Sequence, residues 1–176
     1  MEKNKKILLM GLENAGKTSI LLSLQKKTNL MSYYKLNPTK GVQIVNINDI
    51  HSDYVVWDFG GQAEYRQEYL KDFSKYLIGS DKLIFVIDVQ ATETYDLALD
   101  YFEKIVEFIE KENIQLEISI FLHKFDADIQ LNPNLPLVRE DIPNLKKKLV
   151  SKIPKTIPYK FFKTSIFTGF QKIPDY

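Results

Sequence analysis

Eight residues near the N-terminus have the types and the spacing needed to hold a phosphate group. The segment Gly11-Leu12-Glu13-Asn14-Ala15-Gly16-Lys17-Thr18 fits G-x-x-x-x-G-K-[ST] at every position. Glycines let backbone N–H groups approach an anion, Lys17 would neutralise phosphate charge, and the Thr18 hydroxyl would ligate Mg²⁺. A glycine-rich turn without a ligand is the alternative, and the complete match disfavours it. A phosphate-binding loop is therefore predicted.

The residues around this loop have the strand and helix patterns that the loop requires. Lys6 to Met10 is a short apolar run, and Ile20, Leu21 and Leu24 then recur at helical spacing within Gly16 to Lys27. The loop therefore joins a strand to a helix, the context in which the motif binds phosphate.

A second group of residues with chemical potential follows another β-rich run. Asp58 ends the run Tyr54-Val55-Val56-Trp57 and is followed by Phe59-Gly60-Gly61-Gln62. A carboxylate at the end of a strand suits a water-mediated Mg²⁺ ligand, Gly61 lets a backbone N–H approach phosphate, and Gln62 can orient an attacking water. A strand-ending aspartate in an ordinary turn is the alternative.

The remaining strand signals predict a sheet. Two neighbouring runs would pair through a turn at Asn48 to Asp53, and two continuous apolar runs are typical of central parallel strands. The predicted strands are Val42 to Asp49, Ser52 to Phe59, Lys82 to Asp88, Glu117 to His123 and Tyr159 to Ser165.

Helical patterns alternate with these strands. A crossover helix is indicated by a stripe formed by Leu99, Phe102, Ile105, Val106 and Ile109. Asparagine and proline breakers predict an exposed loop over Asp126 to Arg139, before a helix at about Glu140 to Lys152. Alternation of strands and helices predicts an α/β fold with a mostly parallel, doubly wound sheet.

An aromatic stripe follows Gln62. The side chains of Tyr65, Tyr69, Phe73 and Tyr76 have the spacing of one helix face, and most are expected in the core. Glu64, Tyr65 and Arg66 are expected to be exposed and available to a binding partner.

The loop and the Asp58 segment together resemble the Ras superfamily, and within it the Arf and Rag branches. Gly11 to Thr18 is similar to the Arf sequence GLDNAGKT, with Glu13 in place of Asp, and Trp57 to Gln62 is similar to WDxGGQ. Pro38-Thr39-Lys40-Gly41 resembles the PTxG of the Arf switch I segment. The resemblance implies a P-loop NTPase small G domain over residues 1–176, with about six mostly parallel strands and helices on both faces.

A further segment indicates which base is bound. His123-Lys124-Phe125-Asp126 takes the place of the usual NKxD and resembles the HKxD of Rag proteins. A carboxylate such as that of Asp126 accepts from both N1–H and the exocyclic amine of guanine, whereas adenine offers no such donor pair. Thr164-Ser165-Ile166 resembles the TSI of Rag proteins, with backbone N–H groups near guanine O6.

The resemblance implies a role for each matching position. Gln62, Lys17 and Thr39 would act in catalysis, while Thr18, Thr39 and, through water, Asp58 would hold Mg²⁺. The GTP or GDP would contact Glu13, Asn14, Ala15, Gly16, Lys17, Thr18, Ser19, Thr39, Gly61, His123, Lys124, Asp126, Ser165 and Ile166.

A slow GTP hydrolase that acts as a switch is the leading functional prediction. Switch I and switch II, the latter being the segment after Gln62 that carries the aromatic stripe, would bind an exchange factor and effectors. They would also bind a GTPase-activating protein, because no arginine has an obvious finger position in switch I. A Rag-like scaffold, which binds GTP in a homo- or heterodimer and barely hydrolyses it, is the second hypothesis. An ATP-dependent phosphotransferase is the third, and it has no lid-like arginine cluster to support it.

The composition and the end of the sequence bear on nucleic-acid binding, cellular compartment, membrane attachment and the final helix. Lys and Arg number 24 against 23 for Asp and Glu, so no general attraction to nucleic acid is expected. The chain lacks cysteine, which suits a cytoplasmic protein, and no membrane anchor is visible, so membrane recruitment would depend on partners. Only Phe167 to Tyr176 follow the last motif, so the family's final helix is expected to be short or missing.

Overall fold

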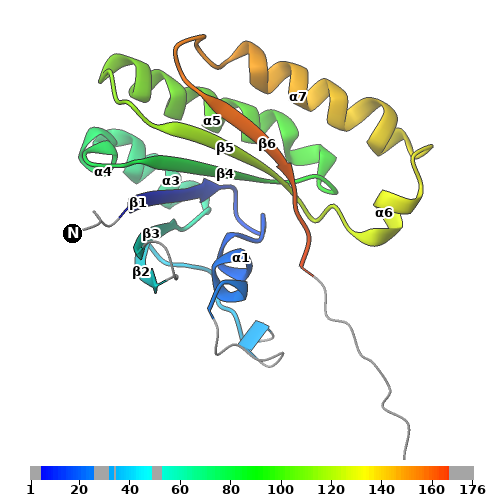
Figure 1. Ribbon diagram of the computed structural model, residues 1–176, viewed down its shortest axis with the longest axis horizontal. Coiled ribbons are helices and arrows are strands. Elements are labelled where there is room, and N and C mark those ends of the chain that lie inside the picture. The colour runs from blue at the N-terminus through cyan, green and yellow to red at the C-terminus, as the bar shows by residue number, and fades with distance from the viewer. Residues whose placement is uncertain (1–4, 26–31, 34, 49–52, 167–176) are drawn as a thin grey trace, which may run out of the picture.

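A six-stranded sheet forms the centre of the computed structural model, which describes residues 5–25, 32–33, 35–48 and 53–166 (Figure 1). Its strands are β1 (Lys5–Gly11), β2 (Val42–Asn48), β3 (Asp53–Phe59), β4 (Lys82–Asp88), β5 (Glu117–His123) and β6 (Tyr159–Lys163). The spatial order is β2-β3-β1-β4-β5-β6, and only the β2–β3 pair is antiparallel. The predicted α/β fold with a mostly parallel sheet is confirmed.

The strand register brings the chemistry-bearing segments to one edge of the sheet. Leu9 lies beside Asp58, Gly11 beside Val86, and Asp88 beside His123. These strands are parallel, so their carboxyl ends, and the loops that follow them, open on the same side. The predicted turn between β2 and β3 lies partly outside the described residues, but Asn48 does pair with Asp53.

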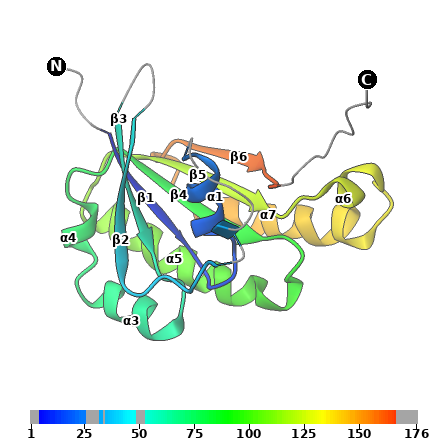
Figure 2. The same cartoon turned by 90° about the horizontal axis from the view of Figure 1, so that it is seen from below.

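Helices cover both faces of the sheet (Figures 1 and 2). The helices are α1 (Lys17–Ser23), α3 (Ala63–Lys71), α4 (Ser74–Leu77), α5 (Tyr95–Lys111), α6 (Ala127–Leu131) and α7 (Ile142–Ser151). A 3₁₀ turn precedes α5 at Thr92–Thr94, and a π-helical turn at Leu137–Asp141 leads into α7. One face carries α1, and the other carries α3, α5 and α7, so the sheet separates two apolar cores.

The larger core lies under α5, as the sequence pattern predicted. All five stripe residues are buried, namely Leu99, Phe102, Ile105, Val106 and Ile109. The smaller core joins α1, through Ile20 and Leu21, to Leu9, Val56 and Val86 of the central strands. Both cores hold the edge at which the loops meet, because each packs against β1 and β4.

The prediction of a loop over Asp126 to Arg139 was wrong. Residues 127–131 form α6, because the breakers begin only at Asn132 and the buried Ile129 anchors the turn. A second departure follows, since residues 137–141 form the π-helical turn. Pro143 lacks an N–H for the carbonyl of Arg139, which accounts for the widened turn and for α7 beginning at Ile142 rather than Glu140.

The aromatic stripe does not lie on one helix, contrary to prediction. The α3 helix ends at Lys71, Asp72 leaves the helical conformation, and α4 begins at Ser74. Tyr69 and Phe73 are buried, as expected of core residues. Among the three residues expected to be exposed, only Glu64 is, because Tyr65 stacks on Tyr69 and the Arg66 guanidinium lies 5.4 Å from the ring of Tyr101.

Two predicted elements are shorter than expected. The α1 helix ends at Ser23, and the Leu24 side chain that follows it is 56% exposed; the last two residues of the predicted helix, Lys26 and Lys27, lie outside the described residues. The β6 strand ends at Lys163 rather than Ser165. Phe167 to Tyr176 lie outside the described residues, and so does the prediction about a final helix. None of the described helices is both long and apolar enough to span a membrane.

Candidate nucleotide-binding site

The predicted phosphate loop lies between β1 and α1 and is anchored from below. The side chains of Leu12 and Ala15 are buried in the two cores, whereas Glu13 and Asn14 are exposed. Positive φ angles of 59° at Asn14 and 90° at Gly16 turn the backbone back toward α1. Apolar anchors on both sides of an exposed tip hold the loop open at the sheet edge.

Lys17 lies beneath this loop with little access to solvent. It is 6% exposed, and its Nζ donates a 2.7 Å hydrogen bond to the carbonyl of Leu12. Burial lowers the pKa of Lys17 to about 8, although the nearby Asp58 carboxylate opposes this effect. A poorly hydrated ammonium at this position would gain strongly from a bound anion.

A histidine packs directly against the loop, and sequence reasoning did not predict this contact. The ring of His123 is so close to Gly16 that a Cβ there would lie 2.5 Å from His123 Cδ2. On its other side, His123 Nδ1 lies 2.9 Å from Thr164 Oγ1. His123 therefore connects the phosphate loop to the segment after β6, through packing on one side and a hydrogen bond on the other.

The burial of His123 predicts a specific dependence of stability on pH. Burial is the largest cause that lowers the pKa of His123, Lys124 adds to it, and Asp88 and Asp126 partly oppose it. The unfolded chain binds this proton near pH 6.5, and the native protein binds it only at lower pH. The contribution of neutral His123 to the free energy of unfolding is therefore fully present above about pH 6.5 and is lost as the pH falls toward the native pKa.

Urea unfolding at pH 8 to 5.5 checks this expectation against a His123→Asn variant. Relative to the variant, the native protein is expected to lose up to about 1.4 kcal/mol per pH unit below pH 6.5. The second histidine, His51, is present in both proteins and cancels in the comparison. If the free energies of unfolding of the two proteins change in parallel with pH, protonation of His123 is not linked to folding.

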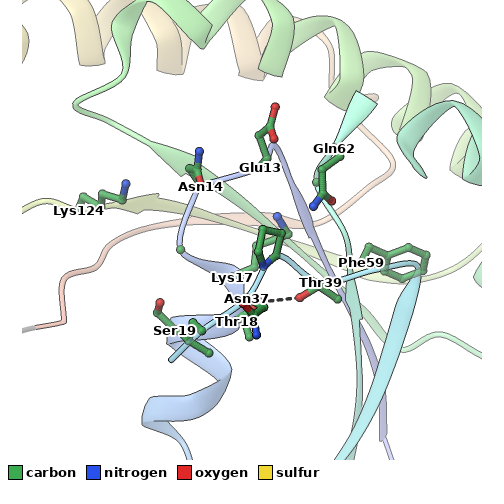
Figure 3. A pocket seen from close by; sticks show the side chains of 14 residues that line it. Glu13, Asn14, Lys17, Thr18, Ser19, Asn37, Thr39, Phe59, Gln62 and Lys124 are labelled. Atoms are coloured by element: carbon green, nitrogen blue, oxygen red, sulfur yellow. Dashed lines mark hydrogen bonds between the residues drawn. The ribbon is translucent and has the colours of Figure 1, made fainter. Parts of the chain in front are cut away.

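Three oxygen-bearing side chains converge at the start of α1. Thr18 Oγ1 lies 2.9 Å from Thr39 Oγ1 (Figure 3). Thr18 Oγ1 also lies 2.8 Å from Asp58 Oδ2, and Thr39 Oγ1 lies 3.3 Å from the same Asp58 oxygen. The other oxygen, Asp58 Oδ1, is buried without a hydrogen-bond partner, and burial raises the pKa of Asp58. Hydroxyl and carboxylate oxygens with an unsatisfied acceptor among them fit a Mg²⁺ site.

The segments around Thr39 and Gln62 are bonded to each other and to the phosphate loop. Gly60 N donates to Gly41 O at 2.9 Å, and Tyr69 Oη donates to the same carbonyl at 2.7 Å. Glu13 N donates to Gly61 O at 3.0 Å. A Cβ on Gly61 would collide with the backbone of Leu12 and Glu13, so this close approach requires glycine.

The predicted base-recognition residues meet where the loops after β5 and β6 come together. Ser165 Oγ donates to Asp126 Oδ1, and Phe125 N donates to Thr164 O at 3.0 Å. Lys124 has a positive φ of 58°. Ile166 packs against the smaller core, which fixes the position of the preceding serine.

A cavity of about 450 Å³ joins most of the predicted site and falls within the usual range of ligand pockets, about 300–1,000 Å³. The predicted residues that line it are Glu13, Asn14, Gly16, Lys17, Thr18, Ser19, Thr39, Gly61, Gln62 and Lys124. Ala15, Asp58 and His123 are buried rather than among the lining residues. Asp126, Ser165 and Ile166 belong to the adjoining loops.

Sequence reasoning missed some residues of this region. Leu36, Asn37 and Phe59 also line the cavity; the first two directly precede the Pro38 to Gly41 segment, and Phe59 lies within the Trp57 to Gln62 segment. Asp88, the last residue of β4, contacts Lys124, and Gln90, just after β4, contacts both Lys124 and Asp126. Their only sequence signal was their place at the carboxyl end of a predicted central strand.

Comparisons with known proteins agree with this geometry. Residues 6–169 match the family described as Gtr1/RagA G protein conserved region. ADP-ribosylation factor-like protein 5 of Caenorhabditis elegans is 30% identical over 132 residues, or 74% of this chain and 68% of the relative. ADP-ribosylation factor-like protein 3 of the same organism is 32% identical over 146 residues, or 77% of this chain and 72% of the relative.

A solved structure supports the fold independently. The Arl6 BBS3 small GTPase from Trypanosoma brucei, determined with the bound nucleotide analogue GppNp, superposes with a TM-score of 0.67. The match covers 93% of this chain and 87% of that chain, at 18% sequence identity. At this identity, the likeness shows the fold alone.

The fold and the family match define the class as a small GTPase, which is a GTP-binding switch protein and a GTP hydrolase. Within that class, the chain belongs to the Gtr1/RagA G protein family and also has the sequence similarity of Arf-like proteins. The predicted resemblance to both the Arf and Rag branches is confirmed.

Proposed function

We propose that this chain is a guanine-nucleotide switch in which GTP and Mg²⁺ hold two segments together, Thr39 to Gly41 and Gly60 to Gln62. The observation that carries the proposal is their shared bonding, in which Gly60 donates to Gly41 while Thr39 and Thr18 both reach Asp58. Neither segment can leave the phosphate loop without disturbing the other. A γ-phosphate that contacts both would therefore stabilise one state of the pair.

The phosphate-binding half of the site would work mainly through charge. Lys17 lies under the loop, and its Nζ would exchange the Leu12 carbonyl for phosphate oxygens or contact both. The hydroxyls of Thr18 and Thr39, with Asp58 acting through a water, would hold Mg²⁺, which neutralises phosphate charge. Asp126 would select guanine by accepting from N1–H and the exocyclic amine.

Hydrolysis would depend on Gln62. Its side chain lies at the cavity, and its Oε1 is buried without a hydrogen-bond partner, which leaves an acceptor free for a water. Among the described residues that line the cavity there is no arginine. We therefore propose slow intrinsic turnover that a GTPase-activating protein stimulates, with an exchange factor and effectors also binding these two segments.

A Gln62→Leu variant is expected to hydrolyse GTP about tenfold more slowly, because it keeps the backbone donors but cannot orient water. Single-turnover release of γ-labelled phosphate from the preloaded protein measures this effect. Gln115→Ala is a matched control, since the Gln115 side chain is exposed and bonds only to Asn113 among the interactions described for it. Equal rates for Gln62→Leu and the native protein would remove Gln62 from the mechanism.

Three observations test the proposal as a whole. Chromatography after denaturation identifies the nucleotide that copurifies, and GDP or GTP is expected. If bound γ-labelled GTP stays unhydrolysed for many hours, even with a GTPase-activating protein present, the result would favour the Rag-like scaffold over the switch. Displacement of bound GDP by ATP at comparable affinity would contradict guanine selection. We also propose that the protein is cytoplasmic and reaches membranes only through partners.

A further inference from the structure

Gln90, which lies outside every recognised motif, contacts both residues proposed to recognise the base. It lies just after β4, and its side-chain Nε2 donates to Lys124 O at 2.8 Å and to Asp126 Oδ2 at 2.9 Å. A primary amide has two N–H groups, so these two bonds use both donors. The side chain therefore bridges the backbone of one recognition residue and the carboxylate of the other.

Asp88 completes a ring of contacts around Gln90. Its Oδ1 accepts the backbone N–H of Gln90 at 2.9 Å, and its Oδ2 accepts from Lys124 Nζ at 2.6 Å. The Asp88 side chain is 14% exposed, so this ion pair is partly shielded from solvent. Gln90 is thus fixed at its backbone as well as at its side chain.

The same ring supports a strained backbone. Lys124 has a φ of 58°, a left-handed conformation that is unfavourable for a residue with a side chain. Gln90 holds the Lys124 carbonyl while Asp88 holds its ammonium group, so both ends of Lys124 are restrained. Residues held in such conformations by their surroundings cluster at ligand-binding sites.

The Asp126 carboxylate is held from both sides. Ser165 donates to Oδ1, and Gln90 donates to Oδ2. An ionised carboxylate accepts about four hydrogen bonds, so two neutral donors leave one acceptor site on each oxygen. The two remaining sites are what a pair of donors on a base edge requires.

We propose that Gln90 is a positioning residue for guanine recognition, which orients the Asp126 carboxylate so that both of its oxygens face the N1–H and the 2-amino group. This inference rests on the proposed function, because it assumes that Asp126 accepts from guanine. Gln90 itself does not touch the base. Its effect is on the alignment of the carboxylate plane, and two hydrogen bonds depend on that plane more than one does.

Comparison of GDP with IDP separates this role from a merely structural one. IDP lacks the 2-amino group, so it needs only one aligned oxygen of Asp126. A Gln90→Ala variant is expected to bind GDP about tenfold more weakly and to show a GDP-to-IDP affinity ratio about fivefold lower than the native protein. A loss of general stability would weaken both ligands equally and leave this ratio unchanged.

Competition against a fluorescent GDP analogue measures both affinities on the same preparation. A Gln90→Glu variant keeps the size of the side chain but removes both donors and faces Asp126 with a second negative charge, so a larger fall in the ratio is expected. Gln115→Ala, which removes an exposed glutamine with no contact to this region, is expected to keep the native ratio. The melting temperature of each variant confirms folding.

The outcomes distinguish the inference from the function on which it rests. If the native protein does not prefer GDP to ADP, the proposed guanine selection fails, and the role of Gln90 fails with it. If the native protein prefers GDP but Gln90→Ala and Gln90→Glu keep the native GDP-to-IDP ratio, Asp126 is aligned without Gln90. That second result would overturn the inference and leave the proposed function intact.

Discussion

An Asp126→Asn protein is expected to bind GDP much more weakly, and XDP much more tightly, than the native protein does. The substitution replaces one carboxylate oxygen with an amide NH₂, which repels the 2-amino group of guanine and donates to the carbonyl that xanthine has there. A site built to pair with a polar group rejects the mismatched partner strongly, so GDP affinity is expected to fall about 100-fold or more. XDP affinity is expected to rise by a similar factor.

Binding of GDP, XDP and ADP by the native and variant proteins measures this change of specificity. XDP should bind the variant less tightly than GDP binds the native protein, since the new amide also meets the amide donor of Gln90. A matched control is Asp128→Asn, the same chemical change at an exposed residue of α6. A variant that loses GDP without gaining XDP would indicate damage to the loop rather than a change in recognition.

The sequence predicted the parts of the fold that repeat a pattern. Continuous apolar runs predicted the central strands within one or two residues, because burial on both faces favours apolar side chains at nearly every position of such a run. The stripe from Leu99 to Ile109 predicted α5 for a similar reason. In each case, one physical requirement acts on every residue of the element.

Prediction failed where a single residue overrode its neighbours. Ile129 buries one short helical turn within a stretch rich in breakers, and Pro143 changes the turn before α7 through one missing N–H. Asp72 divides the aromatic stripe, although Tyr69 reaches the core from α3 and Phe73 reaches it from the position just before α4. Such effects depend on tertiary contacts that a local pattern does not contain.

The candidate site shows the same division. The spacing within a motif predicted the residues that line the cavity, because the backbone there must follow the ligand. The sequence did not predict contacts between motifs, because a contact such as the packing of His123 on Gly16 depends on strand order and register. Gln90 was missed for the same reason, because its partners lie 34 and 36 residues further along the chain.

A Gly61→Ala protein is expected to bind GDP normally but to hydrolyse GTP about 100-fold more slowly. The new Cβ would collide with the backbone of Leu12 and Glu13, which cannot give way as a flexible side chain would, because the core holds Leu12. The segment that carries Gln62 would therefore be displaced from the phosphate loop. GDP has no γ-phosphate for this segment to contact, so GDP affinity should change by less than about threefold.

Gly79→Ala is the control, because the same substitution there places a Cβ that has nothing within 4 Å, although Gly79, unlike Gly61, has a positive φ, of 70°. That variant is expected to lose about 1 kcal/mol of stability from backbone strain and to keep native hydrolysis. Single-turnover hydrolysis and GDP titration of both variants make the comparison. Normal hydrolysis by Gly61→Ala would mean that the close contact between Gly61 and the phosphate loop is not part of the reactive state. The two switch segments would then be coupled only to each other, through the Gly60–Gly41 and Tyr69–Gly41 hydrogen bonds and the contact of Thr39 with Asp58.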